Sequence, residues 1–311
     1  MPAALSFEGV YPILATPFDD QESLDLASLQ RLVGFMADLP VDGVTILGVL
    51  GESNRLLDDE RERVIRTALA AAAGRVPVIV GTSHGGTGAA ADLSKMAESL
   101  GAAAVMVAPP FESIPNEQRI FEFYERIASA ISIPLVVQDH PPSSQVHMSA
   151  ALLLRLVNEI PRVACIKEEA PPTLGKISAL LAGMTTRRVP VLTALGALYG
   201  VFELERGSSG FNTGFAFPEI LTAMLQHARA GRMNDARALY QRFLPLIVFE
   251  QQPGVAIRKE ILRLRGIISS SRVRHPGLSI DARTATQLRE LLELSFEGAD
   301  ISRPIKLAPS K

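Results

Sequence analysis

Short apolar segments alternate with longer amphipathic segments along most of the chain. Each apolar segment ends at a glycine, a proline or a polar cluster, and the segment after it has apolar residues spaced near 3.6, which is typical of strands followed by helices. The predicted strands span residues 9–15, 43–47, 76–80, 103–108, 134–138, 163–167, 189–193 and 210–212. The predicted helices span residues 26–39, 58–73, 88–100, 116–130, 150–159, 173–181, 195–205 and 218–230.

Eight such units, roughly 25 to 30 residues apart, favour a parallel (β/α)8 barrel over a doubly wound sheet. A doubly wound sheet usually has fewer units and a glycine-rich first turn. No G-x-G-x-x-G motif or phosphate-binding loop follows any predicted strand, so a nucleotide site is not indicated. We therefore predict an α/β fold in which residues 1–231 form a (β/α)8 TIM barrel.

Further helical periodicity follows the barrel. Three more helices are predicted at residues 233–249, 256–265 and 282–294. Residues 232–297 are therefore interpreted as a C-terminal helical appendix. Residues 298–311 contain two prolines and little periodicity, which predicts a loose tail.

Composition narrows the class of protein. The 311 residues include 31 Lys and Arg against 33 Asp and Glu, a net charge of −2 that argues against a nucleic-acid partner. No run of about 18 apolar residues predicts a membrane span, and residues 1–10 lack the segments of a signal peptide. The single cysteine, Cys165, excludes a disulfide framework. We expect a cytoplasmic protein that binds a small polar molecule.

In a (β/α)8 barrel the active site lies at the C-terminal ends of the strands, so polar residues there are the first candidates. The candidates at these ends are Thr16, the turn Gly48, Val49, Leu50 and Gly51, and His84, Gln138, His140, Lys167, Glu169 and Asn212.

Lys167 closes an otherwise apolar strand. Burial there would lower the pKa of the amine and leave it able to attack a ketone as a Schiff-base lysine. Strand alternation turns Glu169 to the same side as Lys167 and Glu168 to the other, so Glu169 would stand beside the amine as a proton carrier. The alternative is that the strand simply ends there and these side chains reach solvent.

Two glycines flank the turn that follows the second strand. Such a turn can aim the backbone N–H groups of Val49 and Leu50 at a substrate carboxylate, or it can need its glycines for conformation alone. His84 and His140 also lie at strand ends and are candidates for contact with substrate hydroxyls. No pair of histidines has metal-ligand spacing joined to carboxylates, so we expect no metal.

Several motifs together resemble the dihydrodipicolinate synthase and N-acetylneuraminate lyase family. These are Thr16-Pro17-Phe18, residues 48–52, Pro134 and Pro141 around the fifth strand, and Ile166-Lys167-Glu168 at the end of the sixth. The resemblance spans nearly the whole chain. It implies a homotetrameric barrel with a helical appendix, in which Lys167 forms a Schiff base with a 2-keto acid and no cofactor is needed. It also implies that the turn from Gly48 to Gly51 holds the carboxylate of that acid.

The chain departs from the family pattern at the proton relay. The family motif G-T-T-G-E is G-V-L-G-E at residues 48–52, and Tyr-Asn-x-Pro is Gln-Asp-His-Pro at residues 138–141. Pro-Tyr-Tyr becomes Pro-Pro-Phe at residues 109–111. The tyrosine that relays protons in the family and the tyrosine that the family lends to the neighbouring subunit are thus both replaced. A position that is usually small in the family is Glu169.

These replacements resemble the dehydratase branch of the family, as do Lys-Glu-Glu at residues 167–169 and the C-terminal motifs Glu-Gln-Gln-Pro-Gly at residues 250–254 and Arg-Lys-Glu at residues 258–260. That branch implies dehydration of a 2-keto-3-deoxy sugar acid in pentose catabolism, with L-2-keto-3-deoxyarabonate as the expected substrate and 2-oxoglutarate semialdehyde as the product. Lys167, Glu169 and Gln138 are then the catalytic residues, with Glu169 moving protons and the neutral Gln138 orienting groups.

Two other functions remain open on the sequence. An aldolase would use the same Lys167 imine to cleave C3–C4 and release pyruvate. A non-catalytic keto-acid sensor would keep the fold without its tyrosines, although Lys167 and Glu169 count against it.

Overall fold

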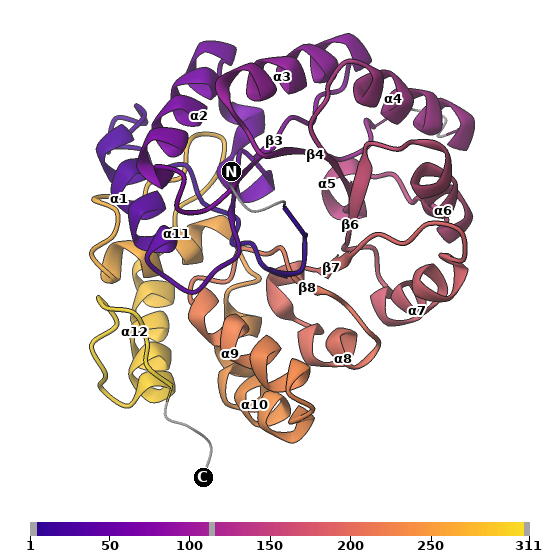
Figure 1. Ribbon diagram of the computed structural model, residues 1–311. Coiled ribbons are helices and arrows are strands. Elements are labelled where there is room, and N and C mark those ends of the chain that lie inside the picture. The colour runs from indigo at the N-terminus through magenta and orange to yellow at the C-terminus, as the bar shows by residue number, and fades with distance from the viewer. Residues whose placement is uncertain (1–4, 112–115, 308–311) are drawn as a thin grey trace.

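Eight parallel strands surrounded by helices form a (β/α)8 barrel in the computed structural model, which describes residues 5–111 and 116–307 (Figure 1). The strands are β1 (Gly9–Val10), β2 (Val44–Ile46), β3 (Val78–Gly81), β4 (Ala104–Val107), β5 (Leu135–Asp139), β6 (Val163–Glu168), β7 (Val191–Thr193) and β8 (Gly210–Phe211). Consecutive strands pair from β2 to β8, and β8 pairs with β1. A bridge between Ile13 and Thr45 joins the end of the first strand to β2 and closes the ring. The predicted fold class is confirmed.

The helices between and after the strands match most of the predicted segments. They are α1 (Leu26–Ala37), α2 (Asp58–Ala72), α3 (Thr87–Leu100), α4 (Glu117–Ser129), α5 (Pro141–Ser144), α6 (Ala150–Glu159), α7 (Thr173–Gly183), α8 (Gly200–Glu205), α9 (Pro218–Arg229), α10 (Met233–Phe249), α11 (Val255–Leu264) and α12 (Ala282–Phe296). The sequence pattern did not predict the short α5 or the 3-10 turns at Val49–Gly51, Ser53–Arg55 and Leu195–Ala197.

Two predicted elements are each five residues shorter than expected. The strand predicted at residues 9–15 is regular only at Gly9–Val10, because Pro12 has no N–H to donate to the sheet. The helix predicted at residues 195–205 begins at Gly200 instead. Three residues before it have positive φ, which an α-helix does not accommodate: Leu195, Gly196 and Ala197, at 49°, 65° and 68°.

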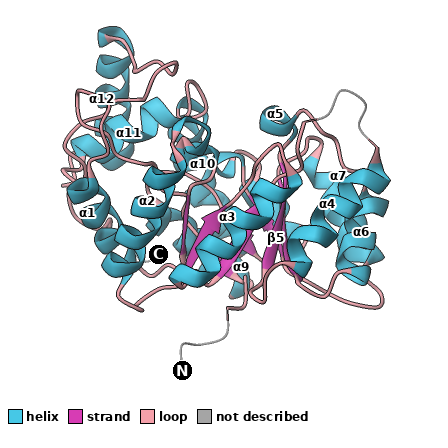
Figure 2. Cartoon of the chain, turned by 90° about the horizontal axis from the view of Figure 1, so that it is seen from above, coloured by secondary structure: helices cyan, strands magenta, loops and turns pink. Residues whose placement is uncertain are grey.

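The expected active site lies where the interior of the barrel meets the helices of the C-terminal region. Tyr11, Met106, Cys165 and Leu192 belong to a buried cluster of inward-facing strand residues. Figure 2 shows α11 on the same side of the barrel as α5, which follows the C-terminal end of β5. The appendix therefore reaches over the end of the barrel where we expected the active site. No helix among the described residues is long and apolar enough to cross a membrane.

Candidate active site

Lys167 lies at the C-terminal end of β6 and faces the barrel interior. Side chains alternate along a strand, so Lys167 follows the inward-facing Cys165 on the same side. The register of the sheet places Gln138 of β5 directly beside it. Lys167 is 2% exposed, and its Nζ lies 2.7 Å from Oε1 of Glu169. The sheet thus brings the three predicted catalytic residues together.

Burial decides the protonation of Lys167. Desolvation lowers the pKa of the amine, and the ion pair with Glu169 opposes this shift without cancelling it. The positive charge of Arg258 lowers the pKa of Lys167 further. An amine with a lowered pKa is neutral in a larger fraction of molecules at neutral pH, and the neutral amine is the nucleophile that attacks a ketone.

Glu169 has one engaged oxygen and one free oxygen. Its Oε1 accepts a hydrogen bond of 2.8 Å from Nε2 of Gln138 as well as the contact from Lys167. Both of these contacts go to Oε1, and Oε2 accepts no hydrogen bond from the described residues. Burial alone would raise the pKa of Glu169, but Lys167, His140 and Gln138 hold it below its usual value. The side chain is therefore an ionised carboxylate in the cavity, which can accept a proton.

Glu168 points to the opposite face of β6, toward α7. There Lys176 contacts Oδ2 of Asp139 and lies 3.7 Å from Oε2 of Glu168. Lys176 also donates a 2.7 Å hydrogen bond to the carbonyl of Met148. The pKa of Glu168 is raised to about 8. Burial is the largest cause, and the negative charge of Asp139 is the second. This cluster stabilises the ends of β5 and β6 on their outer face, which packs against α7, and it does not line the cavity.

Replacing Lys176 by methionine is expected to destabilise the protein by about 3–5 kcal/mol near pH 8, because Asp139 and Glu168 lose their cation while buried. The loss should be smaller at pH 5. Burial raises the pKa of both carboxyls, so they take up protons as the pH falls. Urea unfolding at the two pH values measures this. The exposed pair of Lys95 and Asp92 provides the control, since Lys95→Met should cost less than about 1 kcal/mol.

The turn after β2 lines the same cavity as Lys167 and Glu169. The first hydrogen bond of the 3-10 turn runs from the N–H of Gly51 to the carbonyl of Gly48 at 2.9 Å, which leaves the N–H groups of Val49 and Leu50 without an acceptor inside the turn. The Thr16 hydroxyl donates to the Gly51 carbonyl at 2.7 Å. Gly48 has a φ of −74°, so it is not required for left-handed backbone. A Cβ there would instead lie 3.2 Å from Ile13.

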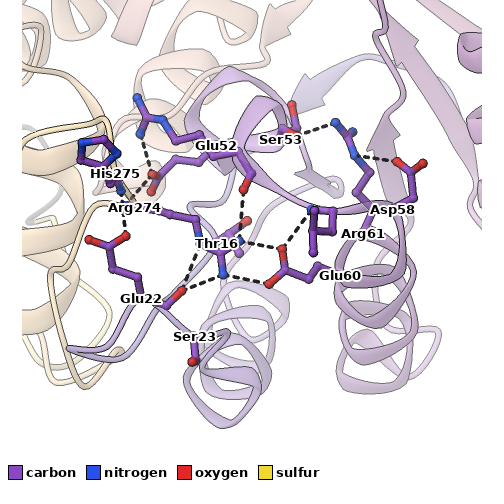
Figure 3. A network of polar contacts seen from close by, with 12 residues as sticks. Thr16, Glu22, Ser23, Glu52, Ser53, Asp58, Glu60, Arg61, Arg274 and His275 are labelled. Carbon is purple, nitrogen blue, oxygen red and sulfur yellow. Dashed lines mark hydrogen bonds and ion pairs between the residues drawn. The ribbon is translucent and has the colours of Figure 1, made fainter.

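A polar network holds this turn from behind (Figure 3). Glu52, which ends the turn with a φ of 52°, accepts 2.7 Å and 3.0 Å hydrogen bonds from the Arg55 side chain and the backbone N–H of Arg274. Its other oxygen lies 2.5 Å from Nζ of Lys259 in α11. The Arg274 side chain in turn binds both oxygens of Glu60 at 2.6 Å and 2.8 Å. The C-terminal region thus supports the turn through the buried Lys259–Glu52 ion pair and the backbone hydrogen bond from Arg274.

If the backbone of this turn holds the substrate carboxylate, Val49→Ala should change the affinity for pyruvate by less than about tenfold, because the N–H groups stay in place. Gly48→Val should remove binding, because its side chain is forced against Ile13. Pyruvate titration of both variants measures this. A large loss for Val49→Ala would show that the side chain carries the interaction.

One cavity of about 360 Å³ contains most of the predicted site, and this size suits a small organic acid. The predicted residues that line it are Val49, Leu50, Gln138, His140, Lys167 and Glu169. Gly48 and His84 line an adjacent cavity of about 510 Å³ that shares Val49, Asn54 and Gln138 with the first. Thr16, Gly51 and Asn212 line neither cavity. Thr16 supports the turn, and Asn212 donates to the Thr45 hydroxyl at 3.1 Å inside the barrel.

The two candidate histidines differ in their surroundings. His140 lies beside the cavity with its Nδ1 2.7 Å from the Ser143 hydroxyl, and burial lowers its pKa, so it is neutral at pH 7. Nδ1 of His84 accepts a 2.9 Å hydrogen bond from the backbone N–H of Gly86. No group of three or more His, Cys, Asp or Glu side chains in the described part of the chain is arranged to hold a metal ion.

The residues that the C-terminal region contributes to the cavity had no predicted role. Gln251, Gly254 and Arg258 line the same cavity as Lys167, as do Gly196 after β7 and Thr213 after β8. The periodicity identified α11 as a helix, but nothing in its spacing indicated which face meets the barrel. The cluster of Gln251, Pro253 and Gly254 before an arginine-bearing helix was the one available signal.

Comparisons with known proteins support the fold and identify the family. The sequence model of the dihydrodipicolinate synthetase family matches residues 6–295. The chain is 40% identical over 285 residues to L-2-keto-3-deoxyarabonate dehydratase of Azospirillum brasilense, covering 90% of this chain and 92% of that protein. It is 32% identical over 260 residues to 4-hydroxy-tetrahydrodipicolinate synthase of Chlorobium limicola, covering 82% and 86%. The crystal structure of dihydrodipicolinate synthase from Rhodopseudomonas palustris superimposes with a TM-score of 0.88 at 34% identity, covering 92% and 97%.

Proposed function

The chain belongs to the dihydrodipicolinate synthetase family and is a lyase of the class I aldolase type, and from this premise we propose that it dehydrates a 2-keto-3-deoxy sugar acid. The proposed substrate is L-2-keto-3-deoxyarabonate, and the proposed product is 2-oxoglutarate semialdehyde. The 40% identity to a dehydratase of that acid supports this choice.

The observation that carries the proposal is the carboxylate beside the lysine. Glu169 Oε1 lies 2.7 Å from the Lys167 amine, and Gln138 holds the same oxygen at 2.8 Å. The free Oε2 then stands next to the carbon atoms of any keto acid bound to Lys167. A carboxylate held at this place can take a proton from one carbon and deliver it to a leaving oxygen.

The proposed reaction begins when the neutral Lys167 amine adds to the C2 ketone. The former ketone oxygen leaves as water with uptake of one proton from solvent, which gives an iminium ion, and the final hydrolysis returns that proton. Glu169 removes a proton from C3, which the iminium makes acidic, and an enamine forms. The enamine expels the C4 hydroxyl as the C4–O bond breaks, and protonation of that oxygen gives water. A proton then leaves C5 and another adds to C3, which gives the C5 enol. The enol becomes the aldehyde, and hydrolysis frees Lys167.

Aldol cleavage is the second candidate, because it starts from the same imine. It requires a base at the C4 hydroxyl proton and no acid for the hydroxyl as a leaving group. Glu169 is the available base for either reaction. The replacement of the family tyrosine by Gln138 favours dehydration, since an amide does not relay protons.

Incubation of the protein with L-2-keto-3-deoxyarabonate and analysis of the products tests the proposal. We expect 2-oxoglutarate semialdehyde in stoichiometric amount with the acid consumed. Pyruvate with an aldehyde would identify an aldolase instead. Binding of the keto acid without turnover would identify a sensor. The absence of a cofactor, the homotetramer and the cytoplasmic location stay predictions.

A further inference from the structure

Arg258 enters the cavity from α11, far along the sequence from the strands that carry the lysine and its partners. It is 7% exposed and lines the cavity together with Lys167 and Glu169. Its positive charge lowers the pKa of Lys167, after the larger effects of desolvation and Glu169. The guanidinium therefore lies close enough to Lys167 to act on a molecule bound there.

The guanidinium is fixed at one edge and free at the other. Its Nε donates a 3.0 Å hydrogen bond to Oε2 of Glu250, whose Oε1 accepts from the backbone N–H of Ala216 at 3.3 Å. Neither terminal nitrogen of Arg258 has a hydrogen-bond partner among residues 5–111 and 116–307. A guanidinium carries five N–H donors in a rigid plane, so four donors remain for a ligand.

Glycines make room for this guanidinium beside the cavity. A Cβ on Gly196 would lie 2.8 Å from Nη2 of Arg258 and 2.2 Å from Nε2 of Gln251. A Cβ on Gly254 would lie 3.7 Å from Nη1 of Arg258. The terminal nitrogens therefore lie against the wall formed by these two glycines, and Gly196 has a φ of 65° that favours glycine on its own account.

The charges around the cavity leave Arg258 as a cation available to a ligand. Arg55 and Lys259 both contact Glu52, and Lys167 contacts Glu169. Glu250 is the acidic partner of Arg258, and burial raises its pKa to about 7. Near neutral pH this carboxyl therefore only partly neutralises the guanidinium.

We propose that Arg258 is a specificity-determining residue whose free guanidinium edge binds the hydroxyl oxygens at the far end of the substrate. This inference rests on the proposed function, in which the turn at Val49 and Leu50 binds the substrate carboxylate and Lys167 reacts with the ketone. The C4 and C5 hydroxyls are the remaining polar groups of the deoxy acid. Pyruvate has no such groups, so Arg258 contributes to the binding of the deoxy acid but not to that of pyruvate.

The test compares Arg258→Gln with the unaltered protein on two ligands. For L-2-keto-3-deoxyarabonate, kcat/KM should fall about 10- to 100-fold, mostly through KM, because a charged hydrogen-bond donor is lost. Trapping of pyruvate on Lys167 by borohydride should stay within about threefold. Arg258→Lys should recover part of the loss, because the ammonium keeps the charge but not the planar pair of donors. Equal losses for both ligands would overturn the proposal in favour of a structural role.

A matched control comes from the same helix. Arg263 lies 2.7 Å from Glu260 and does not line the cavity. Arg263→Gln should therefore change neither kcat/KM for the deoxy acid nor the trapping of pyruvate. A third ligand, 2-oxoglutarate, distinguishes hydroxyls from a second carboxylate. If Arg258→Gln weakens 2-oxoglutarate binding but not that of the deoxy acid, the hydroxyl assignment is wrong. If the unaltered protein traps no pyruvate on Lys167, the proposed function fails before this inference is tested.

Discussion

Replacing Lys167 by alanine is expected to reduce turnover of the deoxy acid by more than about 10⁴-fold. Loss of one acid or base usually costs about 10²- to 10⁴-fold, and here the covalent route itself disappears. In the unaltered protein, borohydride with pyruvate should attach the keto acid at Lys167. Peptide mass mapping locates the adduct, and a rate assay measures the loss.

Two controls separate chemistry from folding in this experiment. Lys167→Arg keeps a cation beside Glu169 but cannot form the imine, so it should be folded and as inactive as the alanine variant. Lys95→Ala removes an exposed lysine that pairs with Asp92 and should keep full activity. Labelling at a lysine other than Lys167, or substantial activity in Lys167→Arg, would contradict the Schiff-base mechanism.

Glu169→Gln should have the second largest effect, with kcat lowered by about 10²-fold or more. The amide keeps the size of the side chain and a hydrogen-bond acceptor for Gln138, but it does not carry a proton. Imine formation on Lys167 should therefore largely survive while elimination fails. Single-turnover trapping and steady-state kinetics on the same preparation separate the two steps.

Glu168→Gln is the matched control, because the same substitution is made one residue away on the same strand. Glu168 faces Lys176 outside the barrel, and its pKa of about 8 means that it is largely protonated at neutral pH. Glutamine resembles the protonated side chain, so kcat should change by less than about fivefold. If Glu168→Gln is the more damaging change, Glu169 is not the proton carrier. If both changes are mild, His140 is the next residue to test.

Periodicity was sufficient for the fold because a barrel strand is buried on both sides. Strands such as β5 and β6 consist of short apolar runs that water-exposed segments do not tolerate, and the intervening helices repeat at a regular interval. Element boundaries were predicted wrongly where the backbone adopts a conformation that the pattern of apolar side chains does not indicate. The run at residues 195–205 is apolar enough for a helix, yet its first three residues adopt left-handed conformations.

The sequence by itself determined the candidate catalytic strand and the direction of its side chains. Alternation of side chains along β6 puts Lys167 and Glu169 on one face and Glu168 on the other, and that rule needs no knowledge of the rest of the chain. Its position directly after β2 placed the turn at the C-terminal end of the barrel, where the active site of this fold is expected.

Only the tertiary structure decided which distant residues complete the cavity. Arg258 meets Lys167 because α11 packs over the end of the barrel, and Glu52 supports the turn because Lys259 and Arg274 reach it from the C-terminal region. Helix spacing specifies which residues share a face but not what that face contacts. Contacts between segments more than 200 residues apart, such as the ion pairs Lys259–Glu52 and Arg274–Glu60, join the appendix to the barrel, and such pairings have no local signature in the sequence.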